Sequence, residues 1–253
     1  MIRSGANAHL KRIGAARAGK EPGVLVLEGE RLIADAARAG ARLDLLLVAE
    51  GRAEPPAAIV ASARETRRVA AALMERLSAL VTSPGLLALG VAPPAPRLRD
   101  LVAGPRSLLL VAAGVADPGN LGALARSAEA AGAAGLVVIS GGASPWNEKA
   151  LRGSMGSLLR VPVVAGAAAE TIARDLGERG VRQVAAATRG GVAAQRFDWS
   201  GRVALWIGGE TGELPAACAG FERVSIPMAG EVESLNVTVA ASLLLFAAGR
   251  VSP

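Results

Sequence analysis

Short apolar runs alternate with helix-length segments between residues 107 and 248, and this alternation constrains the fold more than any other feature of the chain. Strand-like runs cover residues 107–115, 135–140, 161–164, 181–187, 202–207 and 223–226, and helical patterns cover 121–131, 148–159, 168–176 and 235–248. Strands that alternate with helices of about 10 residues form mostly parallel sheets with helices on both faces. Pattern alone therefore predicts a doubly wound α/β fold of nucleotide-binding type for this part of the chain.

A second, smaller alternation precedes it. Helical patterns cover residues 6–17, 30–39, 56–63 and 70–79, and strand-like runs cover 24–27, 43–48 and 86–91. Pro93, Pro94 and Pro96 then follow, and a proline-rich stretch can continue neither a helix nor a central strand. We therefore predict a small α/β domain at residues 1–95, a linker at 96–105 and a second domain at 106–253.

Composition removes several classes of chemistry. Cys218 is the only cysteine and His9 the only histidine among 253 residues. A disulfide and a Cys/His zinc module need more Cys or His than this chain has, so we expect no metal. A Ser-His-Asp triad would need the one histidine, which lies near the N-terminus, and is therefore implausible. No apolar run approaches the roughly 20 residues of a membrane span, and the N-terminus lacks a hydrophobic signal segment, which predicts a cytoplasmic protein.

Positive charge is concentrated in the first part of the chain. The net charge is +6, and residues 1–98 hold 14 Lys/Arg against 9 Asp/Glu, whereas residues 99–253 hold 14 against 13. A basic excess suits a polyanionic partner, because Lys and Arg neutralise phosphates and release counterions. An Arg-rich composition that tracks genomic GC content explains the same excess, so charge by itself does not establish RNA binding.

Three polar, glycine-rich segments interrupt the alternation between residues 107 and 248, at residues 117–126, 208–214 and 226–236. Each lies where a strand-like run ends, which is where an open α/β sheet presents its ligand site. We therefore predict one shared pocket. The chain contains no Gly-x-Gly pair, and Asn120-Leu121 stand where a phosphate loop needs Lys and Ser/Thr, so dinucleotide and NTP motifs are excluded.

Each of these polar residues also has a structural interpretation. Asn120 could cap the helix that follows it, and Arg126 could form an ion pair with Glu129. Gly208 and Gly209 could form an ordinary turn. Ser234 or Asn236 could cap the last helix.

The three segments resemble the three sequence motifs of the SpoU/TrmH family, which are S-adenosylmethionine-dependent RNA ribose 2′-O-methyltransferases. Residues 152–156 and 160–162 are similar to an intermediate segment of the family, and residues 28–31 and 82–85 extend the resemblance over nearly the whole chain. The resemblance implies a homodimer, a C-terminal domain with a deep trefoil knot, against the usual rule for chains, and an N-terminal RNA-binding domain similar to small ribosomal proteins.

The resemblance also implies roles for individual residues. The catalytic candidates are Asn120, Arg126, Glu210, Ser234 and Asn236, and the residues implied to bind the cofactor S-adenosylmethionine are Thr188, Ile207, Gly208, Gly209, Ile226, Met228, Ser234 and Leu235. The candidate RNA contacts are Lys11, Arg12, Arg17, Arg31 and Arg152, with Lys20 as a further basic residue nearby. A guanidinium is hard to deprotonate, so our hypothesis is that Arg126 binds an RNA phosphate and orients the hydroxyl, with Asn120 as its partner. The Glu210 carboxylate can also anchor either Arg126 or Asn120 by a charge-assisted hydrogen bond.

We therefore predict methyl transfer to a ribose 2′-hydroxyl of RNA, with 23S ribosomal RNA as substrate because of the basic N-terminal domain. Two alternatives stay open at this point. One is a methyltransferase that acts on tRNA, and the other is a non-catalytic RNA-binding or ribosome-assembly protein of the same fold.

Overall fold

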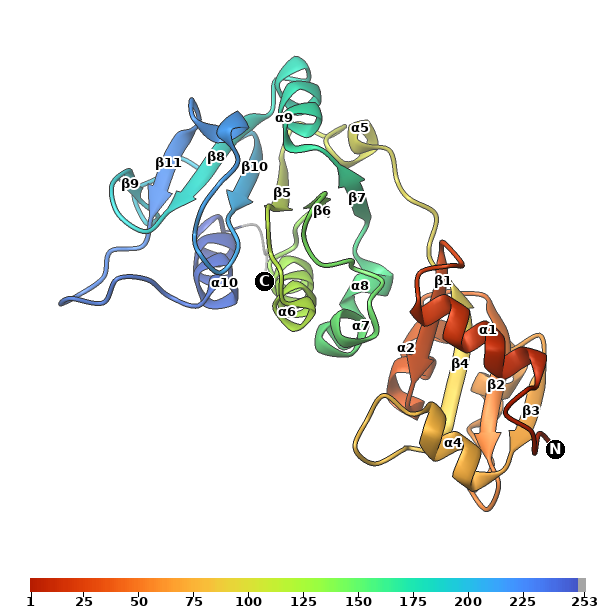
Figure 1. Cartoon of the computed structure of the whole chain (residues 1–253). Helices are drawn as coiled ribbons and strands as arrows, with labels where there is room; N and C mark the ends of the chain where they lie inside the picture. Colours follow the sequence, from red (N-terminus) through yellow and green to blue (C-terminus); the bar gives the residue numbers. More distant parts are fainter. Residues whose placement is uncertain (250–253) are drawn as a thin grey trace. The chain divides into compact units, whose positions relative to one another are not determined.

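The computed structural model describes residues 1–249, which form two compact units. The first unit contains residues 1–94 together with 146–159, and the second contains residues 95–145 and the chain from residue 160 onward. Figure 1 shows the elements of each unit. No helix within residues 1–249 is long and apolar enough to cross a lipid bilayer.

The first unit is built on a mixed four-stranded sheet with the order β1-β4-β2-β3, in which β4 runs antiparallel to β1 and β2, and β3 runs parallel to β2. Its core includes Ile13, Leu47 and Leu89, which are buried between helices and sheet. The bounds are β1 (Val24–Glu28), β2 (Leu43–Ala49), β3 (Thr66–Val69), β4 (Leu86–Val91), α1 (Ala8–Arg17), α2 (Glu30–Arg38), α3 (Ala57–Ser62) and α4 (Ala71–Leu77).

The second unit contains a seven-stranded sheet in which all neighbouring strands are parallel, in the order β7-β6-β5-β10-β8-β11-β9. Its strands are β5 (Ser107–Ala112), β6 (Gly135–Ile139), β7 (Val163–Ala167), β8 (Arg182–Ala187), β9 (Val192–Ala193), β10 (Arg202–Ile207) and β11 (Glu222–Ser225). The parallel α/β architecture confirms the prediction from the alternating pattern. The strand order of a simple doubly wound sheet, which the pattern alone predicted, is wrong, because β10 lies between β5 and β8.

The helices of the second unit pack on this sheet. Trp206 of β10 is fully buried in the core between them. Ser127 of α6 and Ser242 of α10 share a hydrogen bond of 2.6 Å, which joins two helices far apart in sequence. The helices are α5 (Leu98–Leu101), α6 (Pro118–Ala130), α9 (Ala169–Glu178), the 3-10 helix η1 (Ala216–Cys218) and α10 (Val237–Ala247), while α8 (Ser157–Arg160) lies at the boundary of the two units.

The helix predicted at residues 148–159 is two helices, α7 (Glu148–Ser154) and α8. Met155 and Gly156 separate them, because both have left-handed backbone conformations, with φ of 49° and 88°. The predicted linker contains α5, whose Leu98 and Leu101 are buried in the core of the second unit. The strand pattern also missed β3, which carries two arginines, and β9, which has two residues.

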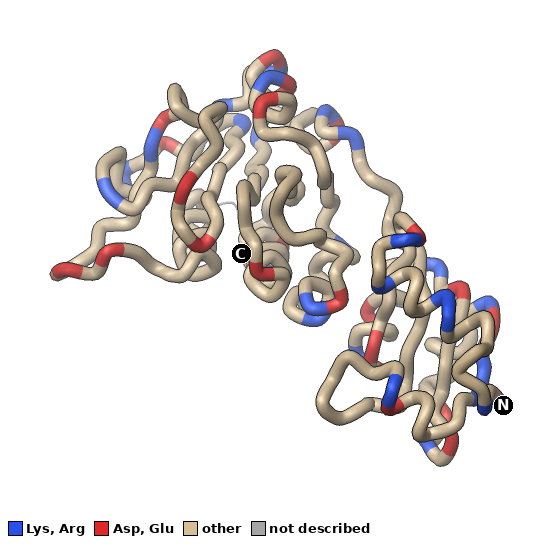
Figure 2. The backbone as a smooth tube through the Cα atoms, viewed as in Figure 1, with Lys and Arg blue, Asp and Glu red and all other residues tan. Residues whose placement is uncertain are grey.

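Figure 2 shows charged residues on both units, whereas α10 carries none. Instead, Val239, Leu243 and Phe246 are 47%, 48% and 56% exposed. Their spacing of four and three residues places them on one face of the helix. An apolar helix face is therefore open to solvent in this chain.

Candidate functional site

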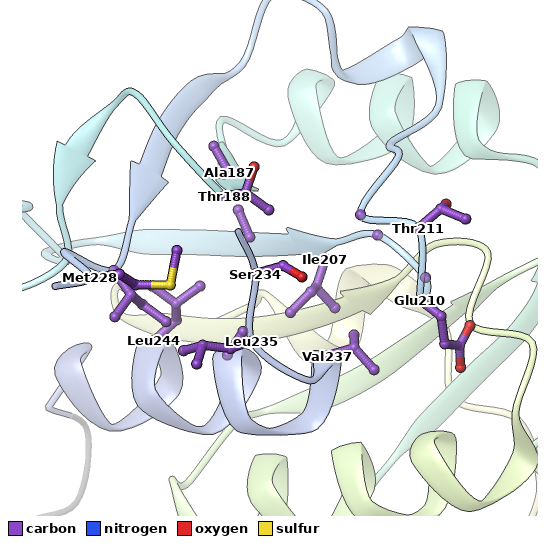
Figure 3. Close-up of a pocket in the computed structure, with 16 residues that line it drawn as sticks. Ala187, Thr188, Ile207, Glu210, Thr211, Met228, Ser234, Leu235, Val237 and Leu244 are labelled. Atoms are coloured by element: carbon purple, nitrogen blue, oxygen red, sulfur yellow. The ribbon is translucent and has the colours of Figure 1, made fainter. Parts of the chain in front are cut away.

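A cavity of about 690 Å³, counting the part open to solvent, lies at the carboxyl ends of β8, β10 and β11. The first turns of α10 close one side of it, and Figure 3 shows the side chains that line it. The lining residues are Ala186, Ala187, Thr188, Ile207, Gly208, Gly209, Glu210, Thr211, Gly212, Ile226, Met228, Ser234, Leu235, Val237, Ala240 and Leu244. The cavity thus occupies the position where parallel sheets bind ligands.

All eight residues that were predicted to bind the cofactor line this single cavity. They come from four places in the sequence, at the ends of β8, β10 and β11 and in the segment before α10. Among the catalytic candidates, Glu210 and Ser234 are in the lining, whereas Asn120, Arg126 and Asn236 are not. The structure therefore brings the second and third glycine-rich segments together around one space, whereas no residue of the first segment (117–126) lines it, so the shared pocket holds for two of the three predicted segments.

Residues 208 and 209 must be glycines because other backbone atoms approach them closely, and not because a turn needs their backbone conformation. A Cβ on Gly209 would lie 2.1 Å from the carbonyl oxygen of Gly114, and a Cβ on Gly208 would lie 2.5 Å from that of Glu213. Both distances are shorter than any real Cβ contact, and both opposing atoms are backbone. Glycine at these positions therefore lets the end of β10 pack directly against the loop after β5 and against residue 213.

Glu210 connects the first and second glycine-rich segments. Its Oε1 accepts hydrogen bonds from Asn120 Nδ2 at 2.8 Å and from the backbone N–H of Asp117 at 3.2 Å, and its Oε2 accepts one from the N–H of Ala116 at 3.1 Å. The hydrogen bond from Asn120 is the largest cause that lowers the pKa of Glu210, and the backbone donors add to it while desolvation opposes it. The carboxylate is thus held ionised across residues 116–120.

The structure corrects the hypothesis for Asn120. Its amide donates to Glu210, so Asn120 is not the partner of Arg126. It does not cap α6 either, because Asp117 is the N-cap and accepts a hydrogen bond from the N–H of Asn120 at 2.9 Å. The helix begins at Pro118, three residues earlier than predicted, because proline is well suited to the first helical position.

Arg126 lies exposed on α6. Its expected ion pair with Glu129 is wrong, because Glu129 accepts two hydrogen bonds from Arg160, at 2.6 Å and 2.9 Å. Arg126 has no ion pair or hydrogen-bond partner in the part of the chain that the structure describes. Its guanidinium is therefore available to a ligand.

Ser234 and Asn236 have different environments. Ser234 is exposed, and its side chain is directed into the cavity (Figure 3). Asn236 is the N-cap of α10, with its Oδ1 accepting from the N–H of Thr238 at 2.9 Å and from the Thr238 hydroxyl at 2.5 Å. The capping interpretation is thus confirmed for Asn236, although its Nδ2 atom has no role in the cap.

Sequence reasoning missed the part of the cavity wall that α10 forms. Val237, Ala240 and Leu244 line the cavity from α10, and their spacing of three and four residues is that of one helix face. That spacing was visible in the sequence as part of the core pattern. Nothing in the pattern distinguished a face that borders a cavity from one that packs against a sheet.

The candidate RNA contacts of the first unit divide into two groups. Arg12 pairs with Glu21 at 2.9 Å and Asp44 at 3.3 Å, and Arg17 pairs with Glu148 at 2.5 Å. Arg152 lies 3.9 Å from the same Glu148. Lys11 and Arg31 are exposed and have no ion pair within residues 1–249.

Cys218 is buried, and burial raises the pKa of its thiol to about 11. The thiol is therefore protonated at neutral pH and is a poor nucleophile. No group of three or more His, Cys, Asp and Glu side chains suited to a metal ion occurs among the described residues.

The fold and the cavity define an α/β protein with a ligand site made by backbone loops at one edge of a parallel sheet. The family profile described as the SpoU rRNA Methylase family matches residues 107–246. The chain belongs to this family.

Related proteins extend the comparison. The 23S rRNA (guanosine-2′-O-)-methyltransferase RlmB of Xanthomonas axonopodis pv. citri is 40% identical over 149 residues, which are 57% of this chain and 59% of that protein. The matched region thus spans less than two thirds of this relative's length.

Solved structures match over almost the whole chain. A crystal structure of an RNA 2′-O ribose methyltransferase is 32% identical, with a TM-score of 0.80 and 98% of both chains covered. The SpoU methyltransferase AviRb of Streptomyces viridochromogenes, in complex with AdoMet, is 28% identical with a TM-score of 0.82, and the match covers 96% of this chain and 98% of that one.

Proposed function

We propose that this chain transfers a methyl group from S-adenosylmethionine to the ribose 2′-hydroxyl of a guanosine in 23S ribosomal RNA. The observation that carries the proposal is the single cavity, in a chain of the SpoU family, that all eight expected cofactor residues line. Two related proteins support the proposal. The RlmB protein is named as a 23S rRNA guanosine-2′-O-methyltransferase, and the AviRb structure is a complex with AdoMet. A cytoplasmic location, where ribosomal RNA is found, is part of the proposal.

The residues of the cavity fit this donor. Ile207, Leu235 and Met228 offer apolar contacts to an adenosine, whereas Thr188, Ser234 and the backbone of residues 208–212 offer polar ones. Bound S-adenosylmethionine would supply an already activated methyl group, so the protein needs to align the reactants and needs no covalent catalyst.

Arg126 then has the role of positioning the RNA. As a guanidinium it stays protonated, so it cannot serve as a general base, but it can bind a phosphate in two hydrogen bonds. A cation near the reacting hydroxyl also stabilises the negative charge that develops on its oxygen. Asn120 and Glu210 keep the loop that leads into α6 in place, and the Ser234 hydroxyl is a hydrogen-bonding group within the cavity.

The proposal keeps residues 1–95 as the RNA-binding domain, 96–105 as the connection and 106–253 as the methyltransferase domain. It also keeps the trefoil knot of the C-terminal segment. The insertion of β10 between β5 and β8, and the hydrogen bond between Ser127 and Ser242, support a chain path that returns into the sheet after leaving it.

We further propose a homodimer through α10. Val239, Leu243 and Phe246 form an exposed apolar face on a helix without charged residues, and a second copy offers the same face in return. Phe246→Glu is expected to give a monomer, measured as mass by light scattering during gel filtration, whereas the control Val192→Glu, at a residue 47% exposed on β9, keeps the dimer. A monomeric wild-type protein would contradict this part of the proposal.

The methyl transfer is tested with labelled donor. Purified protein is incubated with labelled S-adenosylmethionine and either 23S rRNA or total tRNA, and the modified ribose is mapped by reverse-transcription stops at low dNTP. We expect label in 23S rRNA at one guanosine. Label in tRNA alone would show a tRNA methyltransferase. Binding of RNA without any label would show a non-catalytic RNA-binding protein.

A further inference from the structure

A groove lies beside the cavity, on strands β8 and β11 and the loop of residues 212–219. It holds about 1,150 Å³, counting the part open to solvent, and it shares Ala186, Ala187, Thr188 and Gly212 with the cavity. The two spaces are therefore neighbours on the same sheet edge. None of the motifs recognised in the sequence accounts for the groove.

Arg189 and Arg223 line the groove together because of a close contact between two backbone segments. Gly191 has a φ of 91°, and a Cβ at this residue would lie 2.5 Å from the carbonyl oxygen of Arg223 and 2.8 Å from its Cβ. The loop that leaves β8 therefore crosses β11 directly at Arg223, on the side from which that side chain leaves the backbone. Two arginines that are 34 positions apart in the sequence (223 − 189) thus border one groove.

Both arginines are exposed and without an ion pair or hydrogen-bonded side chain among the residues that the structure describes. Arg182, at the amino end of β8, is by contrast paired with Glu222 at 3.1 Å and lies over the ring of Phe197. The two guanidiniums that line the groove are therefore available to an anion. Glu213 contributes a carboxylate to the groove lining, and Leu214 and Pro215 contribute apolar surface.

We propose that this groove binds phosphate groups of the RNA strand next to the nucleotide that is methylated. The inference rests on the proposed function, since it names a second contact surface for the same substrate. A guanidinium binds a phosphate with two parallel hydrogen bonds, and two of them in one groove can contact successive phosphates of a strand. A strand held there passes beside the cavity, because the groove and the cavity share part of their walls.

The test compares the double variant Arg189→Gln/Arg223→Gln with the matched control Arg196→Gln. Arg196 is exposed, has no ion pair within residues 1–249 and does not line the groove. Binding of labelled 23S rRNA is measured by filter retention over a series of salt concentrations, and binding of S-adenosylhomocysteine by calorimetry. Folding of each variant is checked by thermal unfolding.

For the double variant we expect an RNA Kd that rises roughly tenfold and a slope of log K against log salt that falls by about 1 per arginine. Affinity for S-adenosylhomocysteine and the behaviour of Arg196→Gln should be unchanged. Arg189→Lys/Arg223→Lys should recover most of the salt slope, because the charge is retained, but only part of the affinity, because lysine lacks the bidentate fork.

An RNA Kd and salt slope equal to those of wild type would overturn the groove proposal and leave the proposed function intact, provided that the wild type methylates 23S rRNA. A loss of S-adenosylhomocysteine affinity with unchanged RNA binding would also overturn it, because the groove would then belong to the donor site. A wild-type protein that neither binds nor methylates RNA would remove the proposed function and this inference with it.

Discussion

Arginines of the first unit are mostly held by carboxylates, as in the pairs of Arg12 with Glu21, Arg52 with Glu30 and Arg67 with Glu65. In the second unit, Arg126 on α6 and the groove residues Arg189 and Arg223 have no such partners among the described residues. The first unit carries the larger net positive charge in the sequence, yet much of that charge is neutralised locally. Unpaired charge is therefore a better guide to an anion-binding surface than net charge is.

The two units also differ in what keeps their polar groups in place. Pairs between exposed side chains at the surface of the first unit contribute little stability each, about 0–1 kcal/mol. At the cavity, the end of β10 is positioned by backbone atoms that touch Gly208 and Gly209, and by the Glu210 carboxylate on two backbone N–H groups. We therefore expect small effects from single changes in the first unit and large ones at the cavity.

The largest effect is expected for Gly209→Ala. The new Cβ would lie 2.1 Å from the Gly114 carbonyl oxygen, so the loop at residues 208–212 must move away from Gly114, and the cavity wall changes with it. A displacement of about 1 Å can cost roughly 100-fold in rate, and we expect a loss of at least that size in kcat/KM together with weakened S-adenosylhomocysteine binding. Gly220→Ala is the matched control, because its Cβ would meet no atom within 4 Å. Equal activity of Gly209→Ala and Gly220→Ala would contradict the close-packing argument.

Arg126 gives the second largest effect. Arg126→Ala removes the free guanidinium, and we expect kcat to fall by about 100-fold, the usual cost of one donor to a developing oxyanion. Arg126→Lys should recover only a small part of this loss, because lysine cannot form the bidentate contact. Single-turnover methylation of 23S rRNA measures both. If Arg126→Lys turns over at nearly the wild-type rate with unchanged RNA affinity, the orienting role is wrong.

A smaller effect separates paired from unpaired charges in the first unit. Arg31→Gln should lower the salt slope of RNA binding by about 1, because Arg31 has no ion-pair partner within residues 1–249. Arg12→Gln should change RNA binding less, since Glu21 and Asp44 already neutralise this side chain. Filter binding across salt concentrations measures both variants. A larger effect from Arg12→Gln than from Arg31→Gln would break the comparison between paired and unpaired residues.

The smallest effect concerns stability and pH. Hydrogen bonding lowers the pKa of Glu210 in the folded protein below its unfolded value, about 4.3 for an ordinary glutamate. The carboxylate therefore stabilises the fold above that unfolded value, and this contribution is lost as the pH falls through the folded pKa. We expect a lower Tm for Glu210→Gln than for wild type at pH 7, and a difference that shrinks below about pH 4. A difference in Tm that stays constant from pH 7 to pH 3 would contradict this assignment.

Much of the fold could be predicted from the sequence. Val24–Glu28, Leu86–Val91 and Arg202–Ile207 are strands within one residue of their predicted bounds, because each is a continuous apolar run with a turn signal at its end. β3 was missed because its residues Thr66–Val69 alternate weakly and include two arginines. The break between α7 and α8 was missed because the apolar pattern continues through Met155 without a sign of its left-handed backbone.

The segments around the cavity were predictable because they follow the ends of parallel strands, where such sheets bind ligands, and their individual residues were implied by the family resemblance. Their pairing was predictable only in part, because the Glu210 carboxylate could anchor either Asn120 or Arg126, and only the tertiary structure shows that it holds Asn120. The contact of Asn120 with Glu210 joins residues 90 positions apart, and the partner of Arg160 turned out to be Glu129. The cap formed by Asn236, by contrast, is a local contact. Capping was one of the two interpretations of Asn236 that the sequence allowed, beside a catalytic role.

The sequence by itself determined the α/β class and the positions of most elements, because these follow from local periodicity, and the residues around the cavity were implied by its resemblance to a known family. Tertiary structure alone decided that β10 lies between β5 and β8, that Gly209 touches Gly114, and that Arg189 and Arg223 share a groove. The reason is physical. Strand order and contacts between distant segments depend on which surfaces the whole chain can bury together, and no local pattern records that choice.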